Sequence, residues 1–556
     1  MKKKKSGGFY AIRNLIITAL LGAVSYYFML PALNLKDRST YIWALVLIAV
    51  FILLQCISLG VQVVQQRLGE PQVVDIKPRK MLSYWSLKVP MIFGALIILA
   101  VLVGQVSSLV LIRAKDYAAL LEVSDGDFSA DVSEISFDQI PMLDKTSAEK
   151  LGDRKLGELS DMVSQFEVNS AYSQINFQDE PVRVTYLDYG DLIKWFNNRQ
   201  EGLPAYIRIN MVSQEVTVQR LEEGMKYSPS DMFGRDLMRH LRFSYPTLMF
   251  DDVNFEIDEE GHPFWICSVV DKTIGLFGGT DVIGAVIVDA VSGDCTYYAL
   301  DAVPTWVDRV FSADLIMEQY DYRGMYSGGF INSVLGQKNV TISTEGYNYI
   351  AMNDDVWVYT GVTSVTGDES NVGFILSNQR TKETHYYAIA GATEYSAMDS
   401  AEGMVQHLGY TATFPLLLNI SGEPTYFMAL KDASLLVKQY AMVNVQQYQV
   451  VATGSSLEET KANYDDLLAQ NGIAVTVPEA EAAPETVDVS GTVDELRTQV
   501  VEGNTIYYFR VAGQWYSVSA AQWEEAILLE EEKQVTVTVE AGMEGTIISA
   551  IAVSMK

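Results

Sequence analysis

The stretch that decides the fold of the middle of this chain covers residues 283–300 and reads IGAVIVDAVSGDCTYYAL. Its apolar residues alternate with polar ones, run into a polar turn and resume beyond it, as a half-buried β-hairpin requires. The same strand-turn-strand pattern recurs at residues 206–221 and 372–389. This recurrence predicts an internal repeat that is built around antiparallel sheets.

A second pattern occurs twice and joins a helix to a hairpin. The helix-like residues 230–242 precede the hairpin 255–271, and residues 399–408 precede the hairpin 416–432. Both copies have a His-Leu pair near the end of the helix and a Gly-x-Pro turn, at His240-Leu241 and Gly261-His-Pro263, and at His407-Leu408 and Gly422-Glu-Pro424. We expect a duplicated module of one helix and an antiparallel sheet. In it, His240 would match His407, and Trp265 would match Tyr426 on the same sheet face.

The turn at residues 288–294, which reads VDAVSGD, resembles the Val-Asp-x-x-[Ser/Thr]-Gly motif of the PepSY module, a small α+β unit of bacterial secreted and envelope proteins. The resemblance covers stretches within residues 200–300 and 370–460. The copy at residues 377–383 departs from the motif because it lacks both the Asp and the Gly. The resemblance implies a role in binding or inhibiting peptidases, with no catalytic residues in the module.

The C-terminal part begins after a Pro-, Ala- and Glu-rich segment at residues 477–486, which we expect to be a semi-extended linker. Beyond it the pattern predicts strands at residues 487–500, 505–511 and 514–519, a helix at 520–529, and strands at 534–539 and 546–553. Three strands, a helix and two strands are the order of a five-stranded OB-like barrel.

The N-terminal part contains three apolar runs at residues 15–33, 41–64 and 89–112. Each has about the 20 residues that a membrane-spanning helix needs. The first run is not followed by the small residues of a signal-peptide cleavage site. We expect no ionisable residue inside the spans, which argues against a transporter, and we expect Gln55 and Gln105 to form hydrogen bonds between helices.

Charge predicts the orientation. Residues up to Arg113 include 13 basic and 3 acidic side chains, whereas the rest has 27 basic and 67 acidic ones. The basic residues gather before the first run and between the second and third runs, and positive charge is retained in the cytoplasm. We therefore expect a multi-pass protein of the cell membrane with a cytoplasmic N-terminus and an extracytoplasmic region after about residue 113.

Together these patterns predict a fold class of three N-terminal transmembrane helices, α+β extracytoplasmic modules that are PepSY-like, and a C-terminal five-stranded OB-like β-barrel. The expected domains are a membrane domain at 1–113, a first α+β region at 114–225, a PepSY-like module at 226–345, a degenerate second module at 346–476, the linker at 477–486 and the barrel at 487–556.

Two Ser/Thr-x-x-Glu capping boxes predict helix starts at Thr146–Glu149 and Ser456–Glu459. The first overlaps a Ser-x-x-Lys pattern at Ser147–Lys150, but the partner motifs of a nucleophilic serine are missing from the sequence. We expect no bridge between Cys267 and Cys295, because an intervening strand would separate them, and Cys56 lies in an apolar run.

Other chemistry-bearing residues favour structural roles. The four histidines, His240, His262, His385 and His407, have no metal-ligand spacing. The acidic pairs Asp251-Asp252 and Asp354-Asp355 could flank a divalent cation, but a solvated acidic face explains them more simply. Residues 275–279 lack the Lys-Ser/Thr of a phosphate loop and favour a sharp turn. We therefore commit to no catalytic, metal or cofactor site.

The C-terminal aromatic residues Tyr507, Tyr508, Phe509, Trp515, Tyr516 and Trp523 favour core packing over nucleic-acid binding, because few positive charges accompany them. The leading hypothesis is a non-catalytic, membrane-anchored protein that contacts the lipid bilayer and binds a protein partner or organises an envelope assembly. A regulator of an envelope peptidase, implied by the PepSY resemblance, is the first alternative. The second is an enzyme that acts on an envelope polymer through paired carboxylates.

Overall fold

The computed structural model describes residues 7–67, 84–134, 140–159, 161–352, 354–365, 370–473, 486–501, 504–519, 523–540, 547–550 and 552–555. The chain divides into two compact units, residues 1–474 and 475–556. The linker predicted at residues 477–486 lies outside the described residues except for Thr486, the first residue of a strand. The expected domain boundaries inside the first unit stay predictions.

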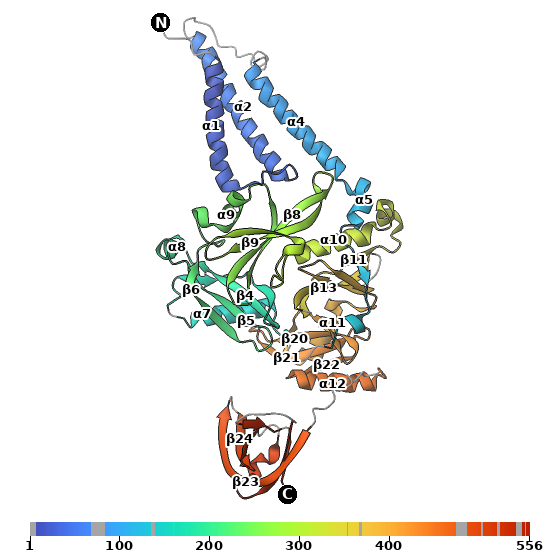
Figure 1. Ribbon diagram of the computed structural model, residues 1–556. Helices are drawn as coiled ribbons and strands as arrows, with labels where there is room; N and C mark the ends of the chain where they lie inside the picture. Colours follow the sequence, from blue (N-terminus) through green and yellow to red (C-terminus); the bar gives the residue numbers. More distant parts are fainter. Residues whose placement is uncertain are drawn as a thin grey trace. The chain divides into compact units, whose positions relative to one another are not determined.

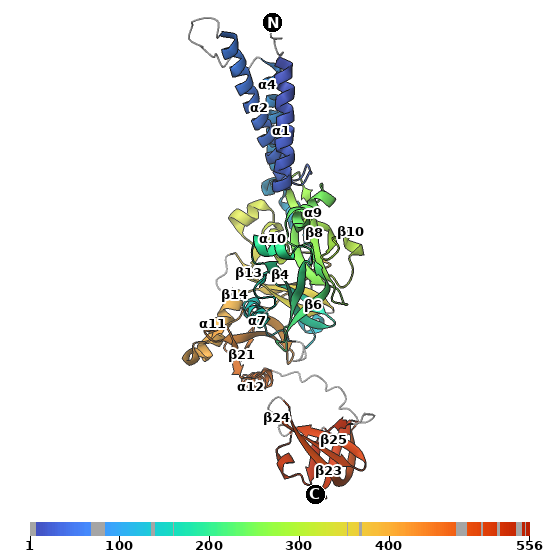
Figure 2. The same ribbon diagram turned by 90° about the vertical axis from the view of Figure 1, so that its left-hand side faces the viewer.

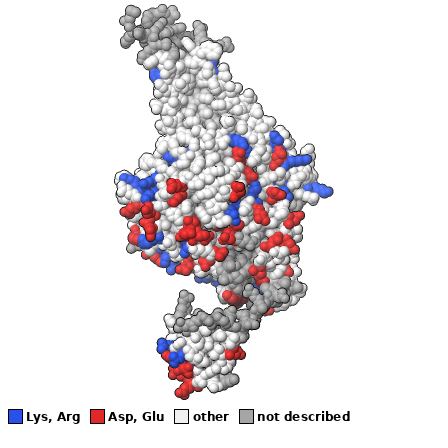
Figure 3. Space-filling model, in the orientation of Figure 1, with Lys and Arg blue, Asp and Glu red and all other residues white. Residues whose placement is uncertain are grey.

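Three long apolar helices begin the first unit: α1 (Gly7–Met29), α2 (Arg38–Arg67) and α4 (Trp85–Ser107). Segments within them, Phe9–Met29, Arg38–Leu59 and Trp85–Ser107, have the length and composition of membrane spans. Figures 1 and 2 show the three helices in two views, and their surface in Figure 3 is almost free of charge. The chain is therefore a multi-pass membrane protein by these criteria.

The helix ends differ from the expected windows. The first helix stops at Met29 because Leu30 adopts a left-handed φ of 48° and a proline follows it. The third stops at Ser107, and the separate helix α5 (Val110–Ala118) follows it. The candidate spans begin before the predicted apolar runs and so include Arg13, Arg38 and Lys88, which lie outside those runs.

Amide side chains connect the three helices. The Asn14 Nδ2 atom donates to Gln55 Oε1 at 2.8 Å, and Gln55 Nε2 donates to Ser86 Oγ at 3.0 Å. Arg38 Nη2 donates to Gln105 Oε1 at 3.3 Å. These bonds confirm that Gln55 and Gln105 link helices, as amides in apolar surroundings do.

A first helix-and-sheet unit follows the helices. Helix α7 (Lys145–Gly157) precedes a sheet in the order β2-β4-β5-β6, with β3 also paired to β4. Its strands are β2 (Phe166–Val168), β3 (Ser173–Phe177), β4 (Glu180–Tyr189), β5 (Leu203–Asn210) and β6 (Val216–Met225). The short helix α8 (Leu192–Asn198) lies between β4 and β5.

The second of four helix-and-sheet units in this part of the chain has the longest strands. Helix α9 (Leu237–Ser244) precedes the sheet β10-β9-β8-β7. Its strands are β7 (Met249–Ile257), β8 (Pro263–Ile274), β9 (Gly278–Asp289) and β10 (Cys295–Ala299). Strand β9 separates Cys267 from Cys295, and both are free thiols, as the sequence predicted.

The third unit begins with helix α10 (Ala313–Tyr326). Its sheet has the order β16-β15-β13-β11, with β12 also paired to β13, and β1 (Ser124–Asp125) joins the β16 edge in parallel. The strands are β11 (Thr341–Ser343), β12 (Asn348–Met352), β13 (Asp355–Ser364), β15 (Gly373–Asn378) and β16 (Thr384–Tyr387).

The fourth unit begins with helix α11 (Glu394–Met404) and ends with helix α12 (Leu457–Gln470). The sheet has the order β18-β20-β21-β22, with β19 also paired to β20. Its strands are β18 (Thr411–Ala412), β19 (Leu416–Ile420), β20 (Glu423–Lys431), β21 (Val437–Asn444) and β22 (Val451–Gly454). The remaining short elements are α6 (Phe128–Asp131), β14 (Ser370–Asn371) and β17 (Gly391–Ala392).

One turn geometry occurs in all four sheets, between the last two strands. An Asn or Asp begins each turn, and its side-chain oxygen accepts hydrogen bonds from the backbone N–H groups two and three residues later. The four residues are Asn210, Asp289, Asn378 and Asn444. The turns at Asn210, Asp289 and Asn378 are those of the three hairpins recognised in the sequence.

The two expected capping boxes have different outcomes. Helix α12 is capped by Ser456, whose Oγ accepts from Glu459 N, as predicted. Helix α7 begins one residue before Thr146, and its cap is Asp144, whose carboxylate accepts from Ser147 N. The capping box at Thr146 was therefore wrong, because a carboxylate two residues earlier occupies the cap position.

The second compact unit is a curled six-stranded sheet in the order β27-β25-β24-β23-β26-β28. Its strands are β23 (Thr486–Val501), β24 (Asn504–Val511), β25 (Gln514–Ser519), β26 (Gln534–Glu540), β27 (Ile547–Ser549) and β28 (Ala552–Met555). A bulge between Val493 and Glu495 divides β23 between two neighbours, β24 and β26.

Three details of this unit differ from the prediction. The last predicted strand is two strands, so the sheet has six strands and not five. The predicted helix at residues 520–529 is a 3₁₀ turn at Glu524–Leu528, and residues 520–522 lie outside the described part. Phe509 and Tyr516 lie in the core as expected, whereas Trp515 packs beside Arg497 and Arg510.

Candidate functional site

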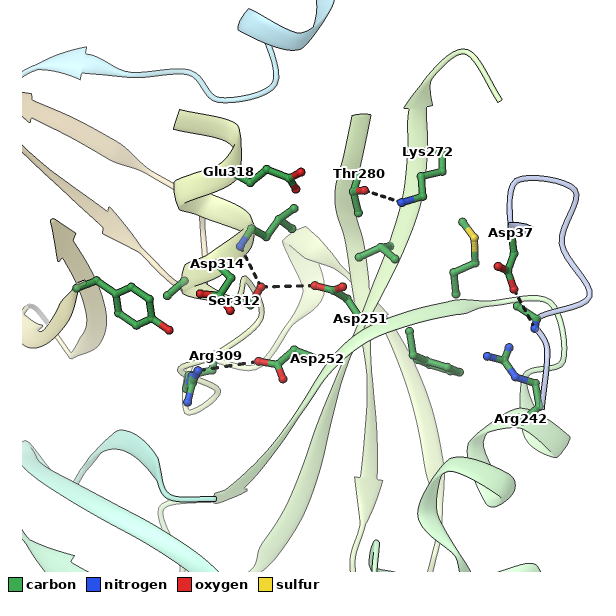
Figure 4. Close-up of a pocket in the computed structure, with 17 residues that line it drawn as sticks. Asp37, Arg242, Asp251, Asp252, Lys272, Thr280, Arg309, Ser312, Asp314 and Glu318 are labelled. Atoms are coloured by element: carbon green, nitrogen blue, oxygen red, sulfur yellow. Dashed lines mark hydrogen bonds and ion pairs between the residues drawn. The ribbon is translucent and has the colours of Figure 1, made fainter. Parts of the chain in front are cut away.

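A large cavity lies where the helices meet the second and third helix-and-sheet units. Its volume is about 780 Å³, within the size range of ligand sites. We call it the helix-end cavity. Its lining comes from the α1–α2 connection (Ala32, Asp37), α9 (Arg242), strands β7 to β9, and the start of α10. Figure 4 shows Asp314 and Glu318 on one side and Asp37 and Arg242 on the other.

A β-bulge places two acidic side chains in this cavity. Strand β7 shifts its register against β8 between Phe250 and Val253, so Asp251 and Asp252 together lie opposite the single residue Ser268. A bulge re-aims side chains that regular alternation would separate. Asp251 Oδ2 accepts from Ser312 Oγ at 3.5 Å, and Asp252 Oδ2 lies 3.9 Å from Arg309 Nη2 (Figure 4). The acidic pair thus lines a cavity that is open to solvent, with Asp251 exposed and Asp252 half-buried.

The cavity has more acidic than basic side chains. Five carboxylates line it, at Asp37, Asp251, Asp252, Asp314 and Glu318, together with three basic groups, at Arg242, Lys272 and Arg309. Burial and the neighbouring charge of Asp252 raise the pKa of Asp251, while burial lowers the pKa of Lys272. The site is therefore polar and has an excess of negative charge.

A buried carboxylate holds the Arg309 loop in place. Glu256 on β7 is fully buried and accepts hydrogen bonds from Asp308 N at 3.0 Å and Arg309 N at 3.1 Å. Asp308 is also buried and accepts from Asn176 N at 2.7 Å. Burial raises the pKa of both carboxyl groups. Neither carboxyl group lines a described cavity, so their role is to position Arg309.

The apolar helices are docked directly onto the second unit. Leu33 N donates to Pro246 O at 2.7 Å, and Lys36 Nζ lies 2.6 Å from Asp271 Oδ2. The tip of the β8–β9 hairpin carries Phe277, whose N–H donates to Ser108 Oγ at 2.9 Å. A Cβ at Gly104 would lie 2.5 Å from the Phe277 ring, so the ring needs a glycine there. These contacts join the strands that line the helix-end cavity to the apolar helices.

The histidines lie apart. His240 Nε2 lies 2.6 Å from Gly293 O, and His262 Nε2 lies 3.0 Å from Asp289 Oδ2. His385 contacts Glu383 and stacks on Trp357. His407 is exposed in a 3₁₀ turn after α11, whereas His240 lies inside helix α9. The expectation that His240 and His407 occupy matching places was therefore wrong, because α11 ends before His407.

Trp265 and Tyr426, by contrast, occupy matching positions. Both are fully buried. Each lies two residues after a proline. The carbonyl of that proline accepts a hydrogen bond from the backbone N–H of the residue after the turn Asp or Asn. The donors are Ala290 N to Pro263 O and Val445 N to Pro424 O. The two residues therefore have the same register relative to the turn Asp or Asn of their sheets.

The other weighed residues have structural surroundings. Gly275 has a φ of 62° in the β8–β9 turn, as the sequence favoured. Asp355 is buried, and its Oδ1 lies 2.6 Å from Arg380 Nε. Asp354 has a left-handed backbone conformation with a φ of 63°. Ser147 lies in α7, and its backbone N–H donates the capping hydrogen bond to Asp144. Within the described ranges, no group of three or more His, Cys, Asp or Glu side chains is placed to hold a metal ion.

Sequence reasoning found Asp251 and Asp252 but missed the rest of this cavity. Arg242, Lys272, Arg309 and Glu318 come from separate elements and form no local motif. No protein-family model matches this chain, and no curated protein matches it either.

Proposed function

We propose that this protein is a membrane-anchored extracytoplasmic binding protein, and that the helix-end cavity receives a lysine or arginine side chain of a protein partner. The observation that carries the proposal is the cavity itself, with five acidic and three basic side chains at the ends of the apolar helices. A basic partner would also be attracted from a distance, because the residues after Arg113 include 67 acidic and only 27 basic ones.

The charge pattern around the helices supports the proposed extracytoplasmic side. Five Lys and Arg residues lie at or before Arg13, and a further basic group lies between the second and third apolar helices. Retention of positive charge in the cytoplasm supports a cytoplasmic N-terminus. Protease added to cells without outer layers should then digest the chain beyond Ile112. Full protection of that region would contradict the proposed orientation.

The four helix-and-sheet units support a module proposal. We infer four copies of one module, because each has a preceding helix, the same meander order and an Asn or Asp at the same turn. In three of them the first strand is split in two, and in the second unit it is bulged. This order is what supports the PepSY-like assignment, and with it the alternative of a peptidase regulator. The curled C-terminal sheet is our candidate for an OB-like domain.

The alternative of an envelope enzyme has one specific observation in its favour. The pKa of Asp251 is raised in a cavity that also contains Asp252 and Glu318, as a general acid would require. Asp251→Asn would remove such an acid while keeping the shape of the side chain. Turnover of envelope polymer fragments that stops in this variant would favour the enzyme over the binding protein.

Site-specific photo-crosslinking tests the binding proposal. Phe250 lines the cavity, so p-benzoylphenylalanine at this position should crosslink the partner in intact membranes. The double variant Asp251→Asn/Asp252→Asn should abolish that crosslink, whereas Asp301→Asn, an exposed acid elsewhere, should not. The same photoreactive residue at the exposed Tyr395 is the control for random capture. A crosslink that persists in the double variant would overturn the proposal.

A further inference from the structure

A second cavity lies where the first, third and fourth sheets meet, and we call it the inter-sheet cavity. Its volume is about 430 Å³, and it shares Arg309 and Tyr347 with the helix-end cavity. Arg183 on β4 and Tyr172 just before β3 line its first-sheet side. The proposed partner-binding function does not use this cavity.

The position of Arg183 stands out when the four sheets are compared by register. In each sheet, one residue of the long central strand pairs with the turn Asn or Asp. The position compared among the four sheets is the next residue along that central strand. That residue is Trp265, Val358 and Tyr426 in the second, third and fourth sheets, and Arg183 in the first. The other three are fully buried, uncharged side chains. The fold therefore does not require a cation at this position.

Arg183 is buried without a partner. It is 6% exposed, and among the described residues its guanidinium makes no hydrogen bond and no ion pair. Two further donors on the cavity wall have no acceptor either, Arg309 Nε and the Tyr172 hydroxyl. Desolvation lowers the pKa of Arg183 to about 10, so the side chain remains charged at neutral pH. Such a group is costly unless something pairs with it.

The inter-sheet cavity is positive in a strongly acidic protein. The chain has a net charge of −30, yet the charged lining residues are Lys145, Arg183, Arg309 and Asp144. The charge of Asp144 is already matched by Lys431, whose Nζ lies 2.6 Å from Asp144 Oδ2. Arg309 Nη2 lies 3.9 Å from Asp252 Oδ2, so the positive charge without an ion pair among the described residues of this cavity is that of Arg183.

The opposite wall of the cavity is apolar. Phe414, Leu416, Phe427 and Met428 of the fourth unit line it, together with Met142 and Met211. A ligand that fills the site needs an oxyanion for the arginines and an apolar body for this wall.

We propose that the inter-sheet cavity binds a small organic anion, with its carboxylate on Arg183, Arg309 and Tyr172 and its apolar body against the fourth sheet. Arginine takes a carboxylate in a planar, two-pronged arrangement, and the tyrosine hydroxyl supplies a further donor. The partner proposed for the helix-end cavity contacts the acidic residues of β7 and α10, whereas this ligand contacts Arg183 and Tyr172, and the two sites share Arg309.

The test uses the full chain in detergent and three probes: 3-phenylpropionate, its neutral amide 3-phenylpropanamide, and inorganic phosphate. Calorimetry and the melting temperature should report binding of 3-phenylpropionate, and neither the amide nor phosphate should match it. Equal binding of the amide would overturn the role of the arginines. Equal binding of phosphate would overturn the role of the apolar wall, and no binding of any probe would overturn the proposal as a whole.

Variants then separate a ligand-binding role of Arg183 from a structural one. Arg183→Met should weaken binding of 3-phenylpropionate by about tenfold or more, and should keep or raise the melting temperature of the free protein. Tyr172→Phe, which keeps the ring, should weaken binding about two- to fivefold. Arg220→Gln, an exposed arginine on the same sheet, is the matched control and should change neither. A lower melting temperature of Arg183→Met with unchanged binding would show that Arg183 is structural.

Discussion

The two cavities of the first compact unit share Arg309 and Tyr347 but differ in how their charges are matched. In the helix-end cavity, Arg309 faces Asp252, and Lys272 donates to Thr280. In the inter-sheet cavity, Arg183 faces no acceptor among the described residues. The larger cavity therefore pairs Arg309 with a carboxylate and keeps an excess of negative charge, whereas the smaller one contains a buried cation without an ion pair in the described part of the chain. An unmatched buried charge is a stronger indication of a missing ligand than volume is.

The largest effect is expected when the residues at equivalent positions of the first and second sheets, Arg183 and Trp265, are replaced. Trp265 is 1% exposed and donates to Tyr227 O at 2.8 Å, so Trp265→Ala should lower the free energy of unfolding by about 3–5 kcal/mol. Arg183→Met, at the equivalent place in the first sheet, should lower it by far less or not at all. Denaturation of the full chain in detergent measures both. Equal losses would mean that both residues are core, and the contrast between the cavities would disappear.

A matched charge next to the inter-sheet cavity should behave in the opposite way. Asp144 pairs with the buried Lys431 and caps α7, so Asp144→Ala should cost about 3 kcal/mol. Although burial raises it, hydrogen bonds from Lys431 and Ser147 hold the pKa of Asp144 below its ordinary value. This stabilisation is present above the unfolded pKa and is lost as pH falls through the folded one. The loss in the variant should therefore shrink in acid, and a loss that is constant with pH would contradict the pairing.

Asp231 is a buried carboxylate whose side-chain hydrogen-bond partners are neutral, so it contrasts with the ion-paired Asp144. Burial raises the pKa of Asp231 to about 6, despite hydrogen bonds from Trp195 and Ser228. Its contribution to stability is fully present below the unfolded pKa and is lost as pH rises through about 6. Relative to Asp231→Asn, the native chain should lose about 2 kcal/mol of unfolding free energy between pH 4 and pH 7. The fluorescence of Trp195, whose Nε1 donates to Asp231, should titrate over the same range and be flat in the variant.

The smallest effect is expected for an exposed pair at the helix ends. Lys36 and Asp271 are 35% and 32% exposed, so Lys36→Met should lower the unfolding free energy by about 0.2–1 kcal/mol. The difference should fall further in high salt. A loss above about 2 kcal/mol would show that this pair behaves as a buried one.

The sequence predicts the local parts of this molecule well. The alternation around Asp289 identifies a hairpin, because a half-buried strand needs it. Three apolar helices follow from length and composition alone. Predictions failed where two residues compete for one role over a few positions. Asp144 displaced Thr146 as the cap of α7, and the sequence does not show that Lys431, far along the chain, reaches Asp144.

Neither cavity could be predicted in full, because their residues come from elements that only the fold brings together. Asp251 and Asp252 were visible as an acidic pair, but the bulge that turns both into a cavity leaves no sequence signature. Arg183 does leave a signal. Once the hairpins are aligned by their turn residues, it is a lone cation in a column that otherwise contains Trp265, Val358 and Tyr426.

The docking of the β8–β9 hairpin against the helix ends fixes the orientation of the helix-and-sheet units relative to the apolar helices. Phe277 contacts Tyr41 of α2 at 5.6 Å between ring centroids and packs on Gly104 of α4. The helix-and-sheet units therefore cannot swivel about the axes of the apolar helices without breaking these contacts. Both cavities then keep a constant height and tilt relative to the apolar helices, so encounters with another membrane protein become a two-dimensional search in which only rotation about the membrane normal is sampled.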